Sequence, residues 1–147
     1  MNNKLFERYH VSGNEHKMRD FIKDEVKNCC DECYYDNFGN IIVRLKGEGR
    51  KVLFNTAIDT AGLLVTYVED DGILRFSAIG NLSAQGLVEK MCISGEITGA
   101  IRAPKDAKLD ELKINDLYID LGLRSHSIKP GAVFALKNEF FENDESV

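Results

Sequence analysis

Cysteines form the most obvious concentration of reactive side chains in this sequence. Cys29, Cys30 and Cys33 lie close together, and Cys30 and Cys33 form a Cys-x-x-Cys pair. A structural zinc site needs four ligands, and neither Cys92 nor any histidine lies at a usual spacing from this pair. A thioredoxin-type pair begins a helix after a strand, whereas this one follows a predicted helix and precedes a predicted strand. We therefore expect ordinary buried or half-buried thiols, and the role of this cluster stays open.

The histidines and serines show none of the spacings that other catalytic sites need. His10, His16 and His126 form no HExxH or related pattern, so we expect them to be surface side chains. Ser12 and Ser83 lack the Gly-x-Ser-x-Gly context of a nucleophile elbow. Residue spacing alone therefore predicts neither a catalytic site nor a metal site.

One amphipathic helix is expected before the cysteine cluster. Ser12-Gly13-Asn14-Glu15 fits a capping box, in which the Ser12 hydroxyl accepts from the Glu15 amide and the Glu15 carboxylate accepts from the Ser12 amide. Apolar residues then recur at spacings of three and four, which is typical of a helix with one apolar face. They are Met18, Phe21, Ile22, Val26 and Cys29.

Three strands are expected after the helix. Residues 33–35 and 41–45 predict two strands, joined by a turn in which Gly39 and Asn40 suit positive φ. Residues 51–58 predict a third strand. Its nearly continuous apolar run suits a strand that is covered on both faces of a sheet.

Beyond Gly62 the pattern changes to short strands separated by turns. These strands are expected at 63–68, 73–76, 91–93, 97–101, 117–121 and 133–136. Such spacing predicts a small barrel or sandwich. A polar loop with a helical turn is expected at 103–116, and another helical turn at 125–128, stopped by Pro130-Gly131. The sequence therefore predicts an α/β fold (α+β overall) with a boundary near Gly62.

Charge and hydropathy exclude several classes of function. The formal net charge is −5 and the pI is near 5.2, and no basic stripe indicates a nucleic-acid binder. No apolar run approaches the length of about 18 residues that a membrane span needs. Residues 1–4 lead directly into amphipathic sequence, without the apolar core of a signal peptide. We therefore expect no nucleic-acid partner, no membrane partner and a cytoplasmic location.

Six short motifs follow one another along residues 11–131. They are Val11-Ser12-Gly13-Asn14-Glu15 with Arg19, the turn Asp36–Asn40, the strand Val52–Asp59 leading into Gly62-Leu63-Leu64-Val65, the hairpin Asp71–Phe76, the strand Leu117–Gly122 and the turn Pro130-Gly131. In this order they resemble the M42 family of metallo-aminopeptidases, of the glutamyl and deblocking aminopeptidase type. The resemblance implies an α/β peptidase domain, interrupted by a small β-rich domain that serves subunit association. Residues 1–62 would be the N-terminal part of the peptidase domain, 63–141 the barrel-like inserted domain, and 142–147 an acidic tail.

The same resemblance implies that the metal site is incomplete. The family's first zinc ligand is a histidine, and its position holds Ala57, whose methyl group has no lone pair. Asp59 aligns with a carboxylate that orients the ligands from outside the metal's coordination shell, and Thr60 takes the place of a glutamate. The remaining ligands and the general base of the family would follow Val147. We therefore expect no catalytic residue, no metal and no cofactor, with Asp59 kept for packing or hydrogen bonding.

Three functional hypotheses follow from this resemblance. The leading one is a truncated, non-catalytic relative that acts through subunit association, as a homo-oligomer or in a complex with a full-length M42 relative. The second is one half of a split aminopeptidase that another chain completes, although Ala57 argues against it. The third is a decayed gene product without a present function. Two surfaces could serve association. One is the inserted domain, and the other is the half-sheet of Ile41, Val43 and the predicted strand at 51–58, whose apolar face later elements of the family cover.

Overall fold

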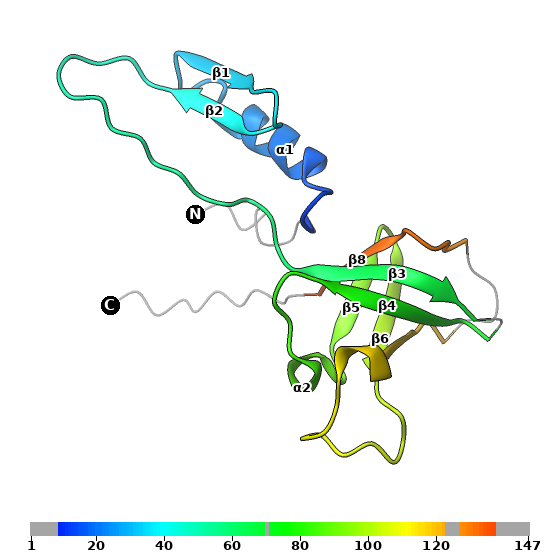
Figure 1. Ribbon diagram of the computed structural model, residues 1–147. Helices are drawn as coiled ribbons and strands as arrows, with labels where there is room; N and C mark the ends of the chain where they lie inside the picture. Colours follow the sequence, from blue (N-terminus) through cyan, green and yellow to red (C-terminus); the bar gives the residue numbers. More distant parts are fainter. Residues whose placement is uncertain (1–8, 70, 123–126, 138–147) are drawn as a thin grey trace, which may run out of the picture.

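The computed structural model describes residues 9–69, 71–122 and 127–137. Its elements are α1 (His16–Val26), β1 (Glu32–Tyr35), β2 (Ile41–Arg44), β3 (Gly62–Val68), β4 (Ile73–Ile79), α2 (Ala84–Leu87), β5 (Met91–Ser94), β6 (Ile97–Arg102), η2 (Ile114–Asp116), β7 (Tyr118–Asp120) and β8 (Val133–Leu136). Within the described ranges they form a helix with a two-stranded sheet, followed by a closed six-stranded barrel (Figure 1). The mixed α/β fold is therefore confirmed. None of the described helices is long and apolar enough to cross a membrane.

The N-terminal group packs α1 against the antiparallel pair β1–β2. The helix confirms the predicted apolar stripe, but Met18 is its one buried residue, at 2% exposure, while Phe21 and Ile22 are half-buried. The helix ends at Val26, so Cys29 lies beyond it rather than on the stripe. A two-stranded sheet covered on one side by a single helix leaves much of its apolar surface exposed, and the N-terminal group buries far less than the barrel.

Side-chain hydrogen bonds fix the turn between β1 and β2 and attach it to α1. Asp36 Oδ1 accepts from the backbone N–H of Phe38 at 2.9 Å and of Asn40 at 2.8 Å. Arg19 Nη1 donates to the carbonyl oxygen of Gly39 at 2.6 Å. Gly39 has φ +82°, and a Cβ there would overlap the Arg19 guanidinium, so both the backbone and the contact require glycine. Asn40 does not take positive φ, contrary to the expectation for it.

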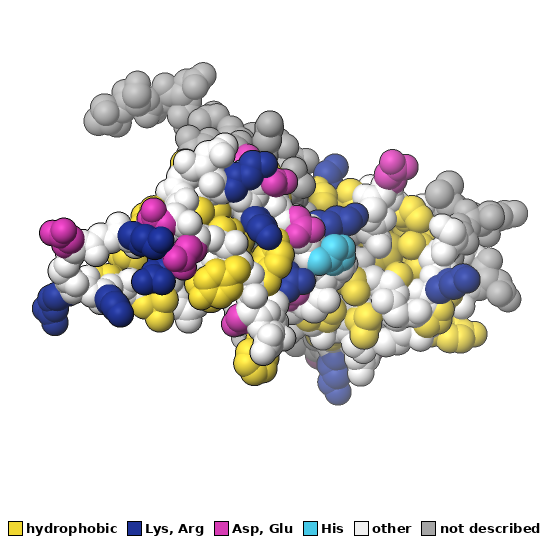
Figure 2. All heavy atoms as spheres, turned by 90° about the horizontal axis from the view of Figure 1, so that it is seen from above, with side chains coloured by type: hydrophobic (Ala, Val, Ile, Leu, Met, Phe, Trp, Pro, Cys, Tyr) yellow, Lys and Arg dark blue, Asp and Glu magenta, His cyan; other side chains and the backbone are white. Residues whose placement is uncertain are grey.

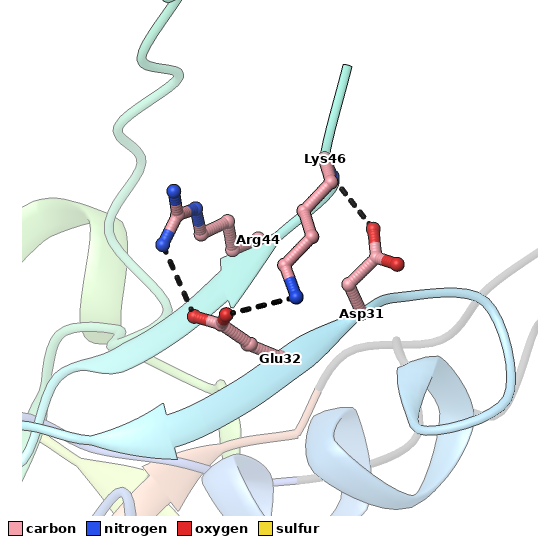
Figure 3. Close-up of polar contacts among 4 residues, drawn as sticks. All are labelled: Asp31, Glu32, Arg44 and Lys46. Carbon is pink, nitrogen blue, oxygen red and sulfur yellow. Dashed lines mark hydrogen bonds and ion pairs between the residues drawn. The ribbon is translucent and has the colours of Figure 1, made fainter.

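Ion pairs join the two strands at the opposite end of the hairpin (Figure 3). Glu32 on β1 lies 3.3 Å from Arg44 Nη1 on β2 and 3.4 Å from Lys46 Nζ. The Asp31 carboxylate accepts from the backbone N–H of Lys46 at 2.6 Å. Because these side chains are largely exposed, each ion pair contributes at most about 1 kcal/mol.

The predicted capping box at the start of α1 does not form. The N-cap residue is Glu15, whose Oε1 accepts from the Gly13 N–H at 2.5 Å instead of the Ser12 amide. The Ser12 hydroxyl donates to Asp59 Oδ2 at 2.6 Å. A tertiary contact across 47 positions of sequence has therefore replaced the local cap that the motif favoured.

The third predicted strand is also wrong. Residues 51–59 have no strand pairing, and all of them are exposed except Ile58, which is half-buried. Figure 1 shows the chain leaving β2 and returning to β3 along a long unpaired path. A strand must pair its N–H and C=O groups, and no described residue makes a backbone hydrogen bond with residues 47–58. The apolar composition of residues 51–58 therefore predicted a buried strand, but no other described part of the chain buries these residues.

The barrel closes in the strand order β3-β4-β7-β6-β5-β8, and each strand pairs antiparallel with its neighbours. Alternate residues point into its core, so that Leu63 and Val65 on β3, Leu74 and Phe76 on β4, and Phe134 on β8 are at most 4% exposed. Closure leaves these strands without free edges, so the barrel satisfies its own backbone. The sequence prediction of a small barrel or sandwich is confirmed as a barrel.

The predicted bounds of the barrel strands hold to within a residue or two, except that β4 continues to Ile79. The helix α2 was not predicted; Ser83 caps it by accepting from the Gly86 N–H at 3.1 Å. The loop at 103–116 contains the short helix η2, as expected. The helical turn predicted at 125–128 lies partly outside the described residues, and its two described positions are not helical.

Candidate functional site

Residues 57–60 lie at the junction between the N-terminal group and the barrel. Thr60 forms an isolated parallel bridge with Val11. The Thr60 N–H donates to the carbonyl of His10 at 2.9 Å, and the Ser12 N–H donates to the carbonyl of Thr60 at 3.1 Å. This bridge fixes the end of the unpaired path immediately before β3 begins.

Gly62, the first residue of β3, brings this junction close to the barrel. It is buried, and a Cβ on it would lie 2.5 and 2.6 Å from the two γ-carbons of Val11 and 2.8 Å from the carbonyl oxygen of Phe134. The space therefore admits a hydrogen at this position and not a methyl group. The absence of a side chain allows the Val11 bridge and β8 to pack against the same residue.

Asp59 is exposed and accepts a hydrogen bond from the Ser12 hydroxyl. The hydrogen bond from the Ser12 hydroxyl is the main reason that the pKa of Asp59 is lowered, and a smaller contribution comes from His10. A carboxylate that accepts a hydrogen bond is stabilised in its charged form. Asp59 therefore connects the junction to the residues before α1, which fits the predicted hydrogen-bonding role.

Ala57 is exposed, and its side chain offers no donor atom to a metal. Two residues further on, Asp59 contributes one carboxylate, which Ser12 already engages. Within the part of the chain that the structure describes, no group of three or more His, Cys, Asp or Glu side chains could hold a metal ion. A dinuclear hydrolytic centre needs several carboxylate and imidazole ligands. The donor set of the described residues does not fit such a centre.

Cys29 and Cys30 lie between the end of α1 and the start of β1, and Cys33 lies within β1. Cys29 is exposed, and Cys30 and Cys33 are half-buried. Desolvation raises the pKa of Cys30, and Cys33 raises it further. Cys92 lies apart in the barrel core, where burial raises the pKa of its thiol to about 12. Raised pKa values disfavour the thiolate, which is the reactive form. The prediction that the Cys-x-x-Cys pair is neither a redox site nor a zinc site stays a prediction.

A shallow groove of about 380 Å³ lies between the start of α1 and the barrel. It is lined by Tyr9, Val11, Asn14, His16, Lys17, Met18, Ile93, Ser94, Gly95, Val133 and Ala135. His16 is exposed there, in keeping with its expected surface position, while His126 lies outside the described residues. The groove does not include Ala57, Asp59 or Thr60, so it is separate from the position of the family's metal site.

Three consecutive, strongly exposed apolar side chains lie on residues 51–58, which we call the 51–58 segment. Val52, Leu53 and Phe54 are 73%, 89% and 92% exposed, and Leu45, just before it, is 72% exposed. Figure 2 shows hydrophobic side chains at the surface among basic and acidic ones. Single exposed apolar residues are ordinary, but three consecutive ones this exposed on an unpaired backbone are not.

A comparison with protein families identifies the architecture. The model of the M42 glutamyl aminopeptidase family matches residues 39–147, which is most of the chain. The chain belongs to the M42 peptidase family. The resemblance seen in the six sequence motifs is thereby confirmed.

Curated M42 relatives are much longer than this chain. A predicted aminopeptidase of Acetivibrio thermocellus is 38% identical over 119 residues, which are 78% of this chain and 36% of that protein. The lysyl aminopeptidase of Pyrococcus furiosus is 37% identical over 86 residues, which are 58% of this chain and 25% of that protein. This M42 chain therefore spans about a third or less of the length of these relatives.

Solved structures share the fold of this M42 chain over almost its whole length. An endoglucanase from Thermotoga maritima superposes with a TM-score of 0.84 at 26% identity, covering 97% of this chain and 46% of that one. The TET1 peptidase of Pyrococcus horikoshii, which can assemble into a tetrahedron or a large octahedral shell, superposes with a TM-score of 0.81 at 28% identity. That match covers 95% of this chain and 46% of the TET1 chain.

Sequence reasoning placed Ala57 and Asp59 but missed the contacts that hold them. Neither the Val11–Thr60 bridge nor the hydrogen bond between Ser12 and Asp59 was expected. The two sides of each contact are almost 50 residues apart, so no local periodicity reports it. The sole available signal was that the two sides of each contact belong to motifs of the M42 resemblance.

Proposed function

We propose that this M42 chain is a non-catalytic subunit that acts by association, with copies of itself or with a full-length M42 relative. The observation that carries the proposal is the exposed 51–58 segment, in which Val52, Leu53 and Phe54 lie open to solvent. An exposed apolar patch of a few hundred Å² is often a functional surface. The division of the chain is part of the same proposal: 1–62 opens a peptidase-type domain, and 63–141 is the inserted association domain.

Covering the 51–58 segment would release free energy similar in size to the cost of association. Val52, Leu53 and Phe54 expose roughly 300 Å² of side chain, taking about 180 Å² for an aromatic and about 80 Å² for an aliphatic side chain. Two copies that cover each other's segment bury roughly 600 Å², which is about 15 kcal/mol at about 25 cal/mol per Å². The loss of free motion on association costs about 4–15 kcal/mol. Burial is therefore similar in size to this cost, to which the ordering of the segment adds.

The non-catalytic part of the proposal rests on donor chemistry at the position of the family's first metal ligand. Ala57 cannot coordinate a metal, and the neighbouring Asp59 carboxylate is engaged by Ser12. A single carboxylate does not assemble the cage that would hold two metals and generate a hydroxide nucleophile. The chain would then act through its surface contacts with other subunits and not through catalysis.

The assemblies of M42 relatives support the association part. The TET1 peptidase of Pyrococcus horikoshii can form a tetrahedron or a large octahedral shell, and another structure of it contains a dodecamer. The barrel of this chain belongs to the region that superposes on TET1. An M42 chain with these elements is therefore suited to subunit contacts.

Native mass spectrometry of the chain isolated from its own cells, combined with an aminopeptidase assay, tests the proposal. We expect complexes that contain two or more M42-type chains. We also expect no hydrolysis of aminoacyl substrates by the purified chain with zinc or cobalt, and none after Ala57→His, because one imidazole does not complete the site. Chelator-sensitive hydrolysis by the unmodified chain would contradict the proposal.

A further inference from the structure

The outer edge of β2 is unpaired in the same part of the molecule as the 51–58 segment. The backbone N–H of Asp36 donates to the carbonyl of Asn40 at 3.0 Å, and the backbone N–H of Asp31 donates to the carbonyl of Arg44 at 3.0 Å. The carbonyls of Asn40 and Arg44 therefore face β1. Backbone groups alternate in direction along a strand. Those of Ile41 and Val43 therefore face away from β1, and no described residue pairs with that edge. An open edge of this kind is a template for a further strand.

The apolar pattern of β2 matches that of the 51–58 segment. Side chains alternate between the two faces of a strand, so Ile41, Val43 and Leu45 share one face. This face is turned towards α1, because Tyr35, opposite Ile41 in the register, donates to Asp20 on α1 at 2.8 Å. The same period of two places Val52, Phe54, Thr56 and Ile58 on a single face of the segment.

We propose that the 51–58 segment of one copy adds as an antiparallel strand to the outer edge of β2 in a second copy, and reciprocally. In the proposed register Ile41 lies opposite Thr56, Val43 opposite Phe54, and Leu45 opposite Val52. The apolar faces of both strands then lie together on the side of the sheet that α1 covers. This inference rests on the proposed function, since it names the partner and the contact through which the chain associates.

A second copy of this chain carries both halves of the contact. Two-fold symmetry makes each surface serve twice, so that neither the 51–58 segment nor the β2 edge of either copy stays unpaired. Within one chain, the bridge between Thr60 and Val11 fixes the end of the segment at the barrel, and the segment runs away from its own β2 (Figure 1). Figure 1 thus shows the two halves of the contact apart in a single molecule.

The area fits a weak but specific dimer. Val43 is 43% and Leu45 72% exposed, which adds β2 side chains to those of the segment. Two copies together would bury roughly 600 Å² of side chain from Val52, Phe54, Val43 and Leu45, with the backbone ladder in addition. That is below the about 1,200–2,000 Å² of a standard interface, so we expect a weak dimer that forms at micromolar concentration and above. The charge of Arg44 on the other face stays paired with Glu32.

Proline substitutions at two adjacent positions test strand addition apart from apolar contact. In the proposed register the N–H of Thr56 points to β2 of the partner, and that of Asn55 points away from it. Proline removes the N–H, which an edge strand tolerates where that group faces solvent and not where it joins the ladder. We expect Thr56→Pro to raise the dimer dissociation constant about tenfold or more in sedimentation velocity. Asn55→Pro and the side-chain control Thr56→Ala should bind like the unmodified chain.

Each outcome of this series decides between defined alternatives. Slower hydrogen exchange of the Val43 and Thr56 amides at high than at low protein concentration, together with the expected proline pattern, supports the inference. A chain that dimerises and loses the dimer with Phe54→Asp, but ignores both prolines, overturns strand addition and leaves the proposed association intact. A larger effect at Asn55 than at Thr56 overturns the register. A monomer with protected amides overturns exchange between copies, because the segment has then closed on its own β2.

Discussion

The substitution Gly62→Ala should destabilise the fold by wedging the junction apart. The added methyl group would sit 2.5 and 2.6 Å from the γ-carbons of Val11 and 2.8 Å from the carbonyl of Phe134. Val11 is 3% exposed and β-branched, so its side chain has few other rotamers to adopt. The Phe134 carbonyl belongs to the barrel backbone, which cannot move without disturbing β8.

The expected magnitude follows from two opposing effects. Overpacking of a well-filled site costs about 1–3 kcal/mol. Replacing glycine removes freedom from the unfolded chain and returns about 0.4–1 kcal/mol. The net loss for Gly62→Ala is therefore about 1–2 kcal/mol, which lowers the urea midpoint by roughly 0.7 M at a slope of about 2 kcal/mol per M.

Urea unfolding followed by circular dichroism measures this, with Gly47→Ala as the matched control. A Cβ at Gly47 meets no atom within 4 Å, and its φ lies outside the left-handed region, so this variant should unfold with or slightly above the unmodified chain. All three proteins must be compared at one concentration, because association adds to apparent stability. If Gly62→Ala and Gly47→Ala have the same urea midpoint, the close approach of Val11 and β8 at Gly62 is refuted.

Three further substitutions or reagents probe the junction, the N-terminal group and the barrel core. Ser12→Ala removes the main cause of the low pKa of Asp59, so an NMR titration should show that pKa rising towards its ordinary value. Because the pKa of Asp59 is lowered in the folded protein, the contact stabilises the fold above the unfolded pKa of about 4, and this stability is lost as the pH falls through the folded pKa. Ser12→Ala should flatten this pH dependence. An unchanged titration of Asp59 would show that the Ser12 hydroxyl does not hold the carboxylate. Arg19→Ala should lower the free energy of unfolding by about 1.5 kcal/mol, because the charge-assisted hydrogen bond to the carbonyl of Gly39 is lost. An unchanged urea midpoint would mean that the turn between β1 and β2 is stable without Arg19. Iodoacetamide at pH 8 should modify the exposed Cys29 quickly, and it should modify Cys92, whose pKa is about 12, only after unfolding. Mass spectrometry of the digested protein measures both rates. Equal rates at the two cysteines would contradict the burial of Cys92.

The sequence predicted the elements whose signals are local. Turn residues and alternating apolar residues located the strands of the barrel, and periodic apolar residues located α1. The barrel is self-contained, so its local patterns and its tertiary structure agree. Errors arose where a distant contact or a missing one decides the structure. Ser12 left its predicted cap for Asp59, and 51–58 has strand composition but no strand to pair with among the described residues.

For the candidate site, the sequence could name residues but could not give their geometry. Motif order located Ala57 and Asp59, because the apolar run before them and the glycine after them mark the position. The hydrogen bond that engages Asp59 depends on how the start of α1 lies against the barrel, and no spacing rule reports that. The missing metal ligand at Ala57 stays a prediction from the resemblance, and the structure was needed to say what the neighbouring carboxylate does.

The central claim is that the exposed 51–58 segment causes association, and light scattering of two matched variants tests it most directly. Phe54 and Phe38 are almost equally exposed, at 92% and 93%, but only Phe54 belongs to the segment. We expect the unmodified chain and Phe38→Asp to exceed the monomer mass of 16.5 kDa over a range of about 1–100 μM, and Phe54→Asp to stay at 16.5 kDa. An unmodified chain that scatters as a 16.5 kDa monomer throughout, or equal weakening by both aspartates, would contradict the account.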